Sequence, residues 1–142
     1  MNKNGFSLIE LLAVILVVGI VGSIAVWGYR AINKNANISS QSAKETVILT
    51  AAKMYGSDNY ILVNTSCKID NKKTKCLIIT LQKLIDNNYY SSIEKCKDAS
   101  TTSCVYNDVT KKIMNDDQIV IYDEGDNVNA SFIKDVNVQI NP

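Results

Sequence analysis

Glu10 and the four cysteines are the residues of this sequence whose types and positions suggest specific chemistry. The 142 residues include no His, which excludes a Ser-His-Asp triad, a Cys-His pair and an HExxH zinc site. The sequence also contains no convincing pair of a nucleophile and a general base. We therefore expect neither enzymatic activity nor a cofactor. A formal net charge of +1 argues against nucleic-acid binding through a broad basic surface.

Glu10 lies at the start of a strongly apolar segment. Residues 11–29 carry no charge, and together with residues 6–10 they are long enough to cross a bilayer as a helix. A buried core helix is one alternative, but a chain of this length rarely encloses so many uncharged residues. A cleaved secretory signal is another, but its apolar stretch would be shorter, about 7–15 residues. We therefore expect residues 6–29 to form a membrane helix.

A carboxylate inside such a helix needs either a cation or access to water. Lys3 is seven residues from Glu10 rather than three or four, so it is a poor partner on the same helix. Two interpretations remain. Glu10 lies near the membrane interface and reaches water, or a cation from another molecule neutralises it.

The residues before Glu10 complete a pattern. Lys3, Gly5 and Phe6 are followed by Ser, Leu, Ile and Glu10, and then by the apolar segment. This pattern resembles the class III signal sequence of type IV pilins and pseudopilins. The resemblance implies that residues 1–5 are a leader, that prepilin peptidase cuts after Gly5, and that it methylates the new amine on Phe6. It also implies that Glu10 pairs with the N-terminal amine of a neighbouring subunit.

The resemblance further implies a fold, a location and partners. The fold would be α+β and pilin-like, with a long N-terminal helix packed on a small C-terminal antiparallel sheet. The chain would be a single-pass membrane protein with a cytoplasmic N-terminus, and then part of an extracellular filament. Its partners would be the lipid bilayer, prepilin peptidase, the membrane assembly machinery, copies of itself and other pilins or pseudopilins. Trp27 stands where family members usually carry Pro, so we expect a straighter helix.

Residues 30–56 are expected to continue the helix in amphipathic form. Apolar residues spaced by 4, 7, 4, 4 and 3 form one narrow stripe, which consists of Ile32, Ala36, Ala43, Val47, Ala51 and Met54. Gly56 is a plausible C-terminal cap. The alternative is two helices broken near Gly28.

Residues 57–142 are expected to form an outer region of helix, loops and strands. Residues 60–63 form a strand or an irregular segment. Residues 80–90 fit a short amphipathic helix with Thr80 as its N-cap. This segment resembles the connecting helix of pseudopilins from Gram-positive bacteria, with Asn88 in place of the usual Gly.

The last part of the chain has the pattern of strands. Residues 119–122 are an apolar run, and residues 128–132 and 136–140 alternate between apolar and polar side chains. Residues 123–127 form an acidic turn between them. We expect an antiparallel meander of three or four strands, and thus an α+β chain. The acidic turn could hold calcium through oxygen ligands, but an ordinary solvated turn is the commoner explanation.

The cysteines all follow the expected membrane segment, at Cys67, Cys76, Cys96 and Cys104. An even number of cysteines outside the cytoplasm favours disulfides, and three connectivities are possible. We favour Cys67–Cys76 and Cys96–Cys104, because each pair closes a short polar loop. A zinc site is the rival, but its usual close pairs of ligands are absent, so we expect no metal.

Charge is unevenly distributed along the outer region. Residues 31–100 carry ten basic and six acidic groups, and residues 101–142 carry three and seven. This is either a solvated surface or a set of opposite-sign faces that meet between neighbouring subunits.

Two functions fit these observations. The first is a structural subunit of a type IV pilus, or of a type II secretion-like or competence pseudopilus, that polymerises through its N-terminal helix. The second is a membrane-anchored extracellular binding or adhesin module that does not polymerise. Cleavage after Gly5 would favour the first, and an intact leader the second.

Overall fold

The computed structural model describes residues 8–92, 94, 96, 103–125 and 127–140, with the backbone alone for residues 21–29 and 31. The chain divides into two units, residues 1–39 and residues 40–142. One helix, α1 (Leu8–Asp58), contributes to both units. Its backbone is helical through Gly28, so the two-helix alternative is wrong at this position.

The first unit consists of the N-terminal part of α1. Within the part of the chain that the structure describes, no helix combines the length and the apolar character needed to cross a membrane. The segment predicted to span a membrane, residues 6–29, includes residues 6–7 and the side chains of residues 21–29, which lie outside the described residues.

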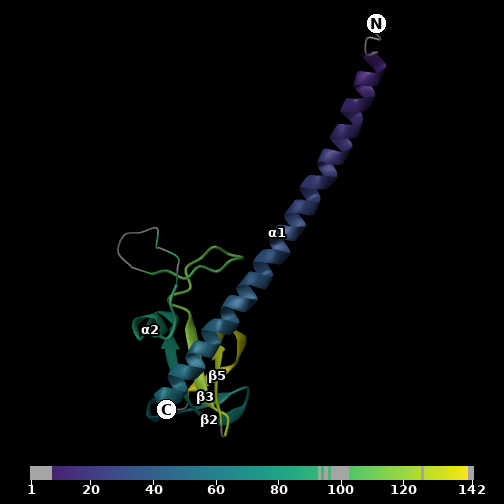
Figure 1. Cartoon of the computed structure of the whole chain (residues 1–142). Coiled ribbons are helices and arrows are strands. Elements are labelled where there is room, and N and C mark those ends of the chain that lie inside the picture. The colour runs from purple at the N-terminus through teal and green to yellow at the C-terminus, as the bar shows by residue number, and fades with distance from the viewer. Residues whose placement is uncertain (1–7, 93, 95, 97–102, 126, 141–142) are drawn as a thin grey trace. The chain divides into compact units, whose positions relative to one another are not determined.

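The second unit is built on a five-stranded sheet (Figure 1). Its strands are β1 (Thr65–Ile69), β2 (Lys72–Thr80), β3 (Gln118–Asp123), β4 (Val128–Phe132) and β5 (Val138–Ile140). They lie in the order β4-β3-β2-β1-β5, and every neighbouring pair is antiparallel. A helix followed by an antiparallel sheet is an α+β arrangement, which confirms the expected fold class.

The sheet is larger than the predicted meander. The predicted strands at residues 119–122, 128–132 and 136–140 correspond to β3, β4 and β5. However, β5 pairs with β1 and not with β4, because the short 3-10 helix η2 (Ile133–Asp135) takes the chain across the sheet to its other edge. Residues 60–62 form another 3-10 helix, η1 (Tyr60–Leu62).

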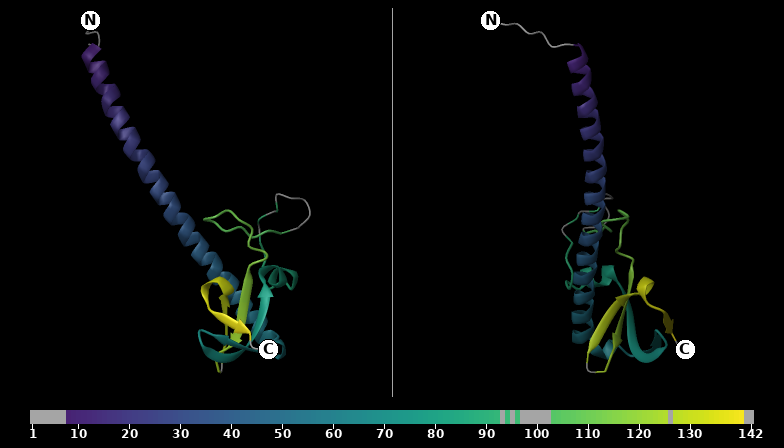
Figure 2. Two further views of the ribbon diagram at one scale, coloured as in Figure 1. Left: turned by 180° about the vertical axis from the view of Figure 1, so that it is seen from behind. Right: turned by 90° about the vertical axis from the view of Figure 1, so that its right-hand side faces the viewer.

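Each face of the sheet has its own apolar layer. On one face, α1 contributes Ile48, Ala52 and Tyr55, which are buried with Ile121 and Phe132 of the sheet. On the other face, Cys67, Cys76 and Val120 are covered by the residues that connect β4 to β5. Figure 2 shows the end of α1 and this connection on opposite sides of the sheet.

The apolar stripe identified in residues 30–56 lies mostly on a side of α1 that does not pack against the sheet. Val47 and Met54 are 57% and 59% exposed, whereas Ile48 is fully buried. Of that stripe only Ala51 lies in the core. The helix carries apolar residues on two sides, and the side with the larger Ile48 and Tyr55 packs against the sheet.

Gly56 does not cap the helix, which continues to Asp58. Instead, Gly56 lies where α1 packs closely against the sheet. A Cβ at this position would collide with Ile121 Cγ2 and lie 2.8 Å from Val128 Cγ1. The absence of a Cβ at Gly56 therefore allows the helix to pack against the sheet and does not serve to end the helix.

The short helix α2 (Leu81–Asp86) forms where the sequence predicts it. Thr80 is its N-cap, and its side chain accepts a hydrogen bond from the Lys83 N–H at 3.4 Å. Asn88 has φ of 60°, the left-handed conformation that Asn tolerates better than most residues.

Candidate functional site

Only some residues of the N-terminal pattern are among those that the structure describes. Gly5 and Phe6 lie outside the described residues. Glu10 lies in the first turn of α1 as described, and its side chain is exposed.

The helix around and after Glu10 exposes apolar side chains on all sides. Leu8 and Ile9 are about four-fifths exposed, and large apolar residues remain at least half exposed further along, at Leu11, Leu12, Val14, Ile15, Leu16, Val17, Val18 and Ile20. Such a surface is stable only when lipid or other apolar helices cover it. We therefore expect the N-terminal part of α1 to be covered by lipid or by other apolar helices.

The structure joins the cysteines in two disulfides. Cys67 bonds to Cys76, and Cys96 bonds to Cys104, which is the pairing favoured by the sequence. Cys67 and Cys76 link β1 and β2 and are both buried. The second disulfide fastens the segment that follows α2.

A cluster of polar residues fixes that segment to α1. Lys44 Nζ lies 2.8 Å from Asp108 Oδ1, 3.4 Å from Glu94 Oε1 and 2.7 Å from the Tyr106 carbonyl oxygen, to which it donates. Ser40 donates to Asp108 Oδ2 at 2.6 Å. The cluster lies at the surface of the core and is only partly exposed.

The pKa values in this cluster reflect its contacts. Burial opposes the charge of Lys44, but the hydrogen bond to Asp108 and the nearby Glu94 outweigh it and raise the lysine pKa. Hydrogen bonds from Lys44 and Ser40 lower the pKa of Asp108. Both groups are thus held in their charged forms at neutral pH.

Two buried amides complete the attachment. Gln41 Oε1 accepts a hydrogen bond from the Asp108 N–H at 2.8 Å. Asn115 Oδ1 accepts from the Val105 N–H at 2.8 Å, while its Nδ2 donates to Gln82 Oε1 at 2.6 Å. Nothing in the local sequence around Gln41 and Asn115 distinguishes these two residues from surface amides, so their role could not be predicted.

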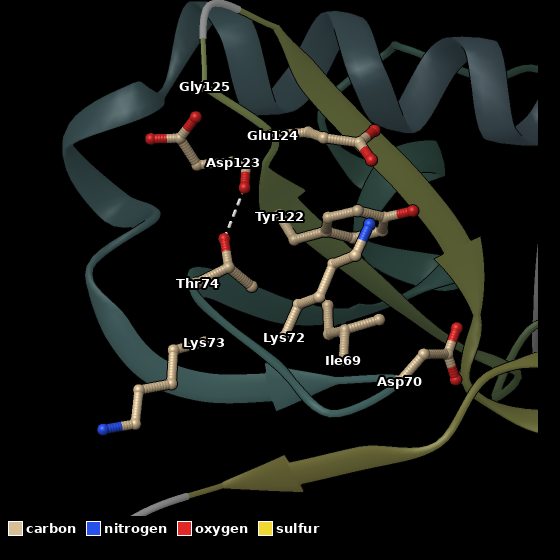
Figure 3. A pocket seen from close by; sticks show the side chains of 9 residues that line it. All are labelled: Ile69, Asp70, Lys72, Lys73, Thr74, Tyr122, Asp123, Glu124 and Gly125. Atoms are coloured by element: carbon tan, nitrogen blue, oxygen red, sulfur yellow. Dashed lines mark hydrogen bonds between the residues drawn. The ribbon is translucent and has the colours of Figure 1, made fainter.

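The acidic turn lies beside a pocket of about 290 Å³ (Figure 3). Lys72 and Glu124 both line it, so residues of both oppositely charged chain segments border one pocket. Asp123 Oδ2 accepts from the Tyr60 hydroxyl at 2.6 Å, and its Oδ1 is buried without a partner. Among the described residues, no three Asp, Glu or Cys side chains are grouped to hold a metal ion, and Asp126 lies outside them.

The fold and the N-terminal helix together define a class of protein. A helix that exposes a continuous apolar surface, followed by an α+β unit with an antiparallel sheet, is consistent with a pilin-like arrangement. Residues 1–26 match the family model of the prokaryotic N-terminal methylation motif. The chain thus carries the class III signal sequence of type IV pilins and pseudopilins. No curated protein and no solved structure matches it.

Proposed function

We propose that this chain is a structural subunit of a type IV pilus, or of a type II secretion-like or competence pseudopilus. Prepilin peptidase removes residues 1–5 and methylates Phe6. The mature chain then polymerises through its N-terminal helix.

The exposed apolar surface of α1 is the observation that carries this proposal. Before assembly, lipid would cover that surface, with the N-terminus in the cytoplasm. In a filament, the helices of neighbouring subunits would replace the lipid at little cost, because both surroundings are apolar. The chain would therefore move from the cell membrane to an extracellular filament without unfolding its second unit.

Glu10 gives this transfer its specificity. An ionised carboxylate within an apolar bundle is costly unless a cation neutralises it. The amine created on Phe6 of a neighbouring subunit would supply that cation. Each new subunit would then be selected by one ion pair in surroundings that strengthen it.

The methylation motif belongs to structural proteins and not to an enzyme family. Copies of this chain, other pilins or pseudopilins, prepilin peptidase and the membrane assembly machinery are the partners this function requires. The bilayer is the partner before assembly.

Replacing Glu10 tests the proposal. We expect Glu10→Ala to accumulate in the membrane at the wild-type level but to form at least about tenfold fewer multimers in cells that assemble the wild type. Glu124→Ala, which also removes one exposed carboxylate, is the matched control and should assemble normally. Wild-type multimers from Glu10→Ala would refute this role of Glu10.

A further inference from the structure

Three lysines form a basic patch on one face of the β1–β2 hairpin. Lys68 and Lys73 lie directly opposite each other in the register, and Lys75 lies two residues after Lys73 on the same face. Like charges opposite each other across two strands are unfavourable. Within the described part of the chain, none of the three lysines takes part in an ion pair. The basic patch thus holds three positive charges for which the described residues supply no ion-pair partner.

Lys72 differs from this patch although it is adjacent in sequence. It lines the pocket with Tyr122 and Glu124. Figure 3 shows Lys72 extending toward those two residues and Lys73 extending away from them. The alternation of the strand directs the side chains of Lys72 and Lys73 to opposite sides, although both residues line the pocket.

An acidic patch lies at the other end of the sheet. It consists of four carboxylates and one cation, namely Glu45, Asp116, Asp117, Asp135 and Lys134. Lys134 Nζ lies 2.8 Å from Glu45 Oε1, and three carboxylates remain in excess. Burial raises the pKa of Asp117, and the carboxylates of Glu45 and Asp116 raise it further against the effect of Lys134. The acidic patch therefore has a formal charge of three negative units.

Lys73 and Asp117 are too far apart to pair within one subunit. Thr80 at the end of β2 pairs with Gln118, which directly follows Asp117. Lys73 lies seven residues earlier on the same strand, a separation of roughly 23 Å at about 3.3 Å per residue. A lysine side chain does not bridge that distance, so the charges must find partners elsewhere or remain solvated.

We propose that the basic patch of one copy of this chain binds the acidic patch of a second copy. The patches have equal and opposite formal charge, and Lys73 and Asp117 lie toward opposite ends of β2. Contact between two different patches is heterologous, and each copy keeps one patch available for the next. Such contacts build an open array, so the inference rests on the proposed filament function and names the surfaces through which the second units meet.

Paired charge reversals in the full-length chain test this contact. Lys73→Glu with Lys75→Glu reverses the basic patch, and Asp116→Lys with Asp135→Lys reverses the acidic patch. A third variant combines all four changes. Lys53→Glu with Lys112→Glu is the control, because both lysines are exposed and outside the patches. Multimers are quantified after cross-linking on intact producing cells, and thiol labelling confirms that the disulfides of each variant are formed.

We expect each single-patch reversal to lower the multimer fraction by about tenfold or more, because like charges then face each other. The combined variant should recover most of the loss, since the charges are again opposite. The control should assemble like the wild type. Normal assembly of either single-patch variant, or no recovery in the combined variant, would overturn the proposal.

Three further outcomes separate this inference from its alternatives. If the basic-patch variant assembles normally but is no longer retained on immobilised DNA, the basic patch serves a nucleic acid and the proposal is wrong. If the wild type forms no multimers and keeps its leader, the filament function itself fails, and this inference fails with it. If the wild type is cleaved and assembles but all patch variants do too, only the inference fails.

Discussion

Lys44 and Asp108 form an ion pair, with 2.8 Å between Nζ and Oδ1, although 64 residues separate them in the sequence. The pair joins α1 to the segment that follows α2. Both side chains are less than one-fifth exposed, so water screens the pair less than it does most surface ion pairs. Together with the Cys96–Cys104 disulfide and the hydrogen bonds of Gln41 and Asn115, this contact attaches the segment to the rest of the second unit.

Breaking the pair should weaken the second unit. We expect Asp108→Asn to lower the free energy of unfolding by about 1–2 kcal/mol, since Lys44 loses a charged acceptor and Ser40 keeps only a neutral one. Chemical denaturation of the full chain in detergent measures this. Asp116→Asn removes an exposed carboxylate without a hydrogen-bond partner among the described residues, and is the control. Equal stability of the two variants would contradict the role of the pair.

The same pair makes stability depend on pH at both extremes. The folded pKa of Asp108 lies below its ordinary value of 3.8, so its contribution is full above pH 3.8 and disappears as the pH falls through the lowered value. The folded pKa of Lys44 lies above 10.5, so its contribution is full below pH 10.5 and disappears as the pH rises through the raised value. Asp108→Asn should flatten the acid limb of the stability profile.

The close contact at Gly56 predicts that even the small side chain of Ala at this position lowers the stability of the fold. In Gly56→Ala the new Cβ would collide with the fully buried Ile121, so the sheet or the helix must shift. The strain of about 1–3 kcal/mol should exceed the gain of about 1 kcal/mol in helix propensity. At Gly19 an added Cβ meets nothing within 4 Å, so Gly19→Ala is the matched control. A stabilised Gly56→Ala would show that the contact yields without strain.

The two disulfides should each add stability. Replacing Cys67 and Cys76 together by Ala should lower the free energy of unfolding by roughly 2–3 kcal/mol, and replacing Cys96 and Cys104 should have a similar effect, because both close short loops of similar length. Labelling the unreduced native chain with a thiol reagent should modify none of the four cysteines. Labelling of any one of them would contradict the pairing.

Local signals in the sequence were sufficient for several elements. The alternating apolar pattern identified β4 and the apolar run identified β3, and Thr80 marked the start of α2. In each case the information lies within a few neighbouring residues. The α+β class follows from the order of these elements.

The β1–β2 hairpin could not be found from apolar periodicity, because lysines occupy much of it. One signal was available. Asp70 and Asn71 have φ values of 48° and 69°, and both residue types tolerate the left-handed conformation that a two-residue hairpin turn requires. The Asp-Asn pair, between Ile69 and Lys72, marks that turn.

The tertiary contacts could not be predicted from the sequence without knowledge of the fold. Spacing alone cannot tell which apolar side of α1 packs on the sheet, because Val47 belongs to the apolar stripe and is exposed, whereas Ile48 lies outside it and is buried. Gly56 could not be distinguished from a cap until Ile121 was placed beside it. The partners of Lys44 lie 50 and 64 residues away, beyond the reach of any local pattern.

The mass of the mature chain tests the central claim most directly. If the chain is a processed filament subunit, intact-mass analysis of protein from producing cells should show a chain that begins at Phe6 and carries one added methyl group. Gly5→Leu should retain residues 1–5 and remain unmethylated in the same cells. A wild-type chain that still begins at Met1, in cells with active prepilin peptidase, would contradict the account.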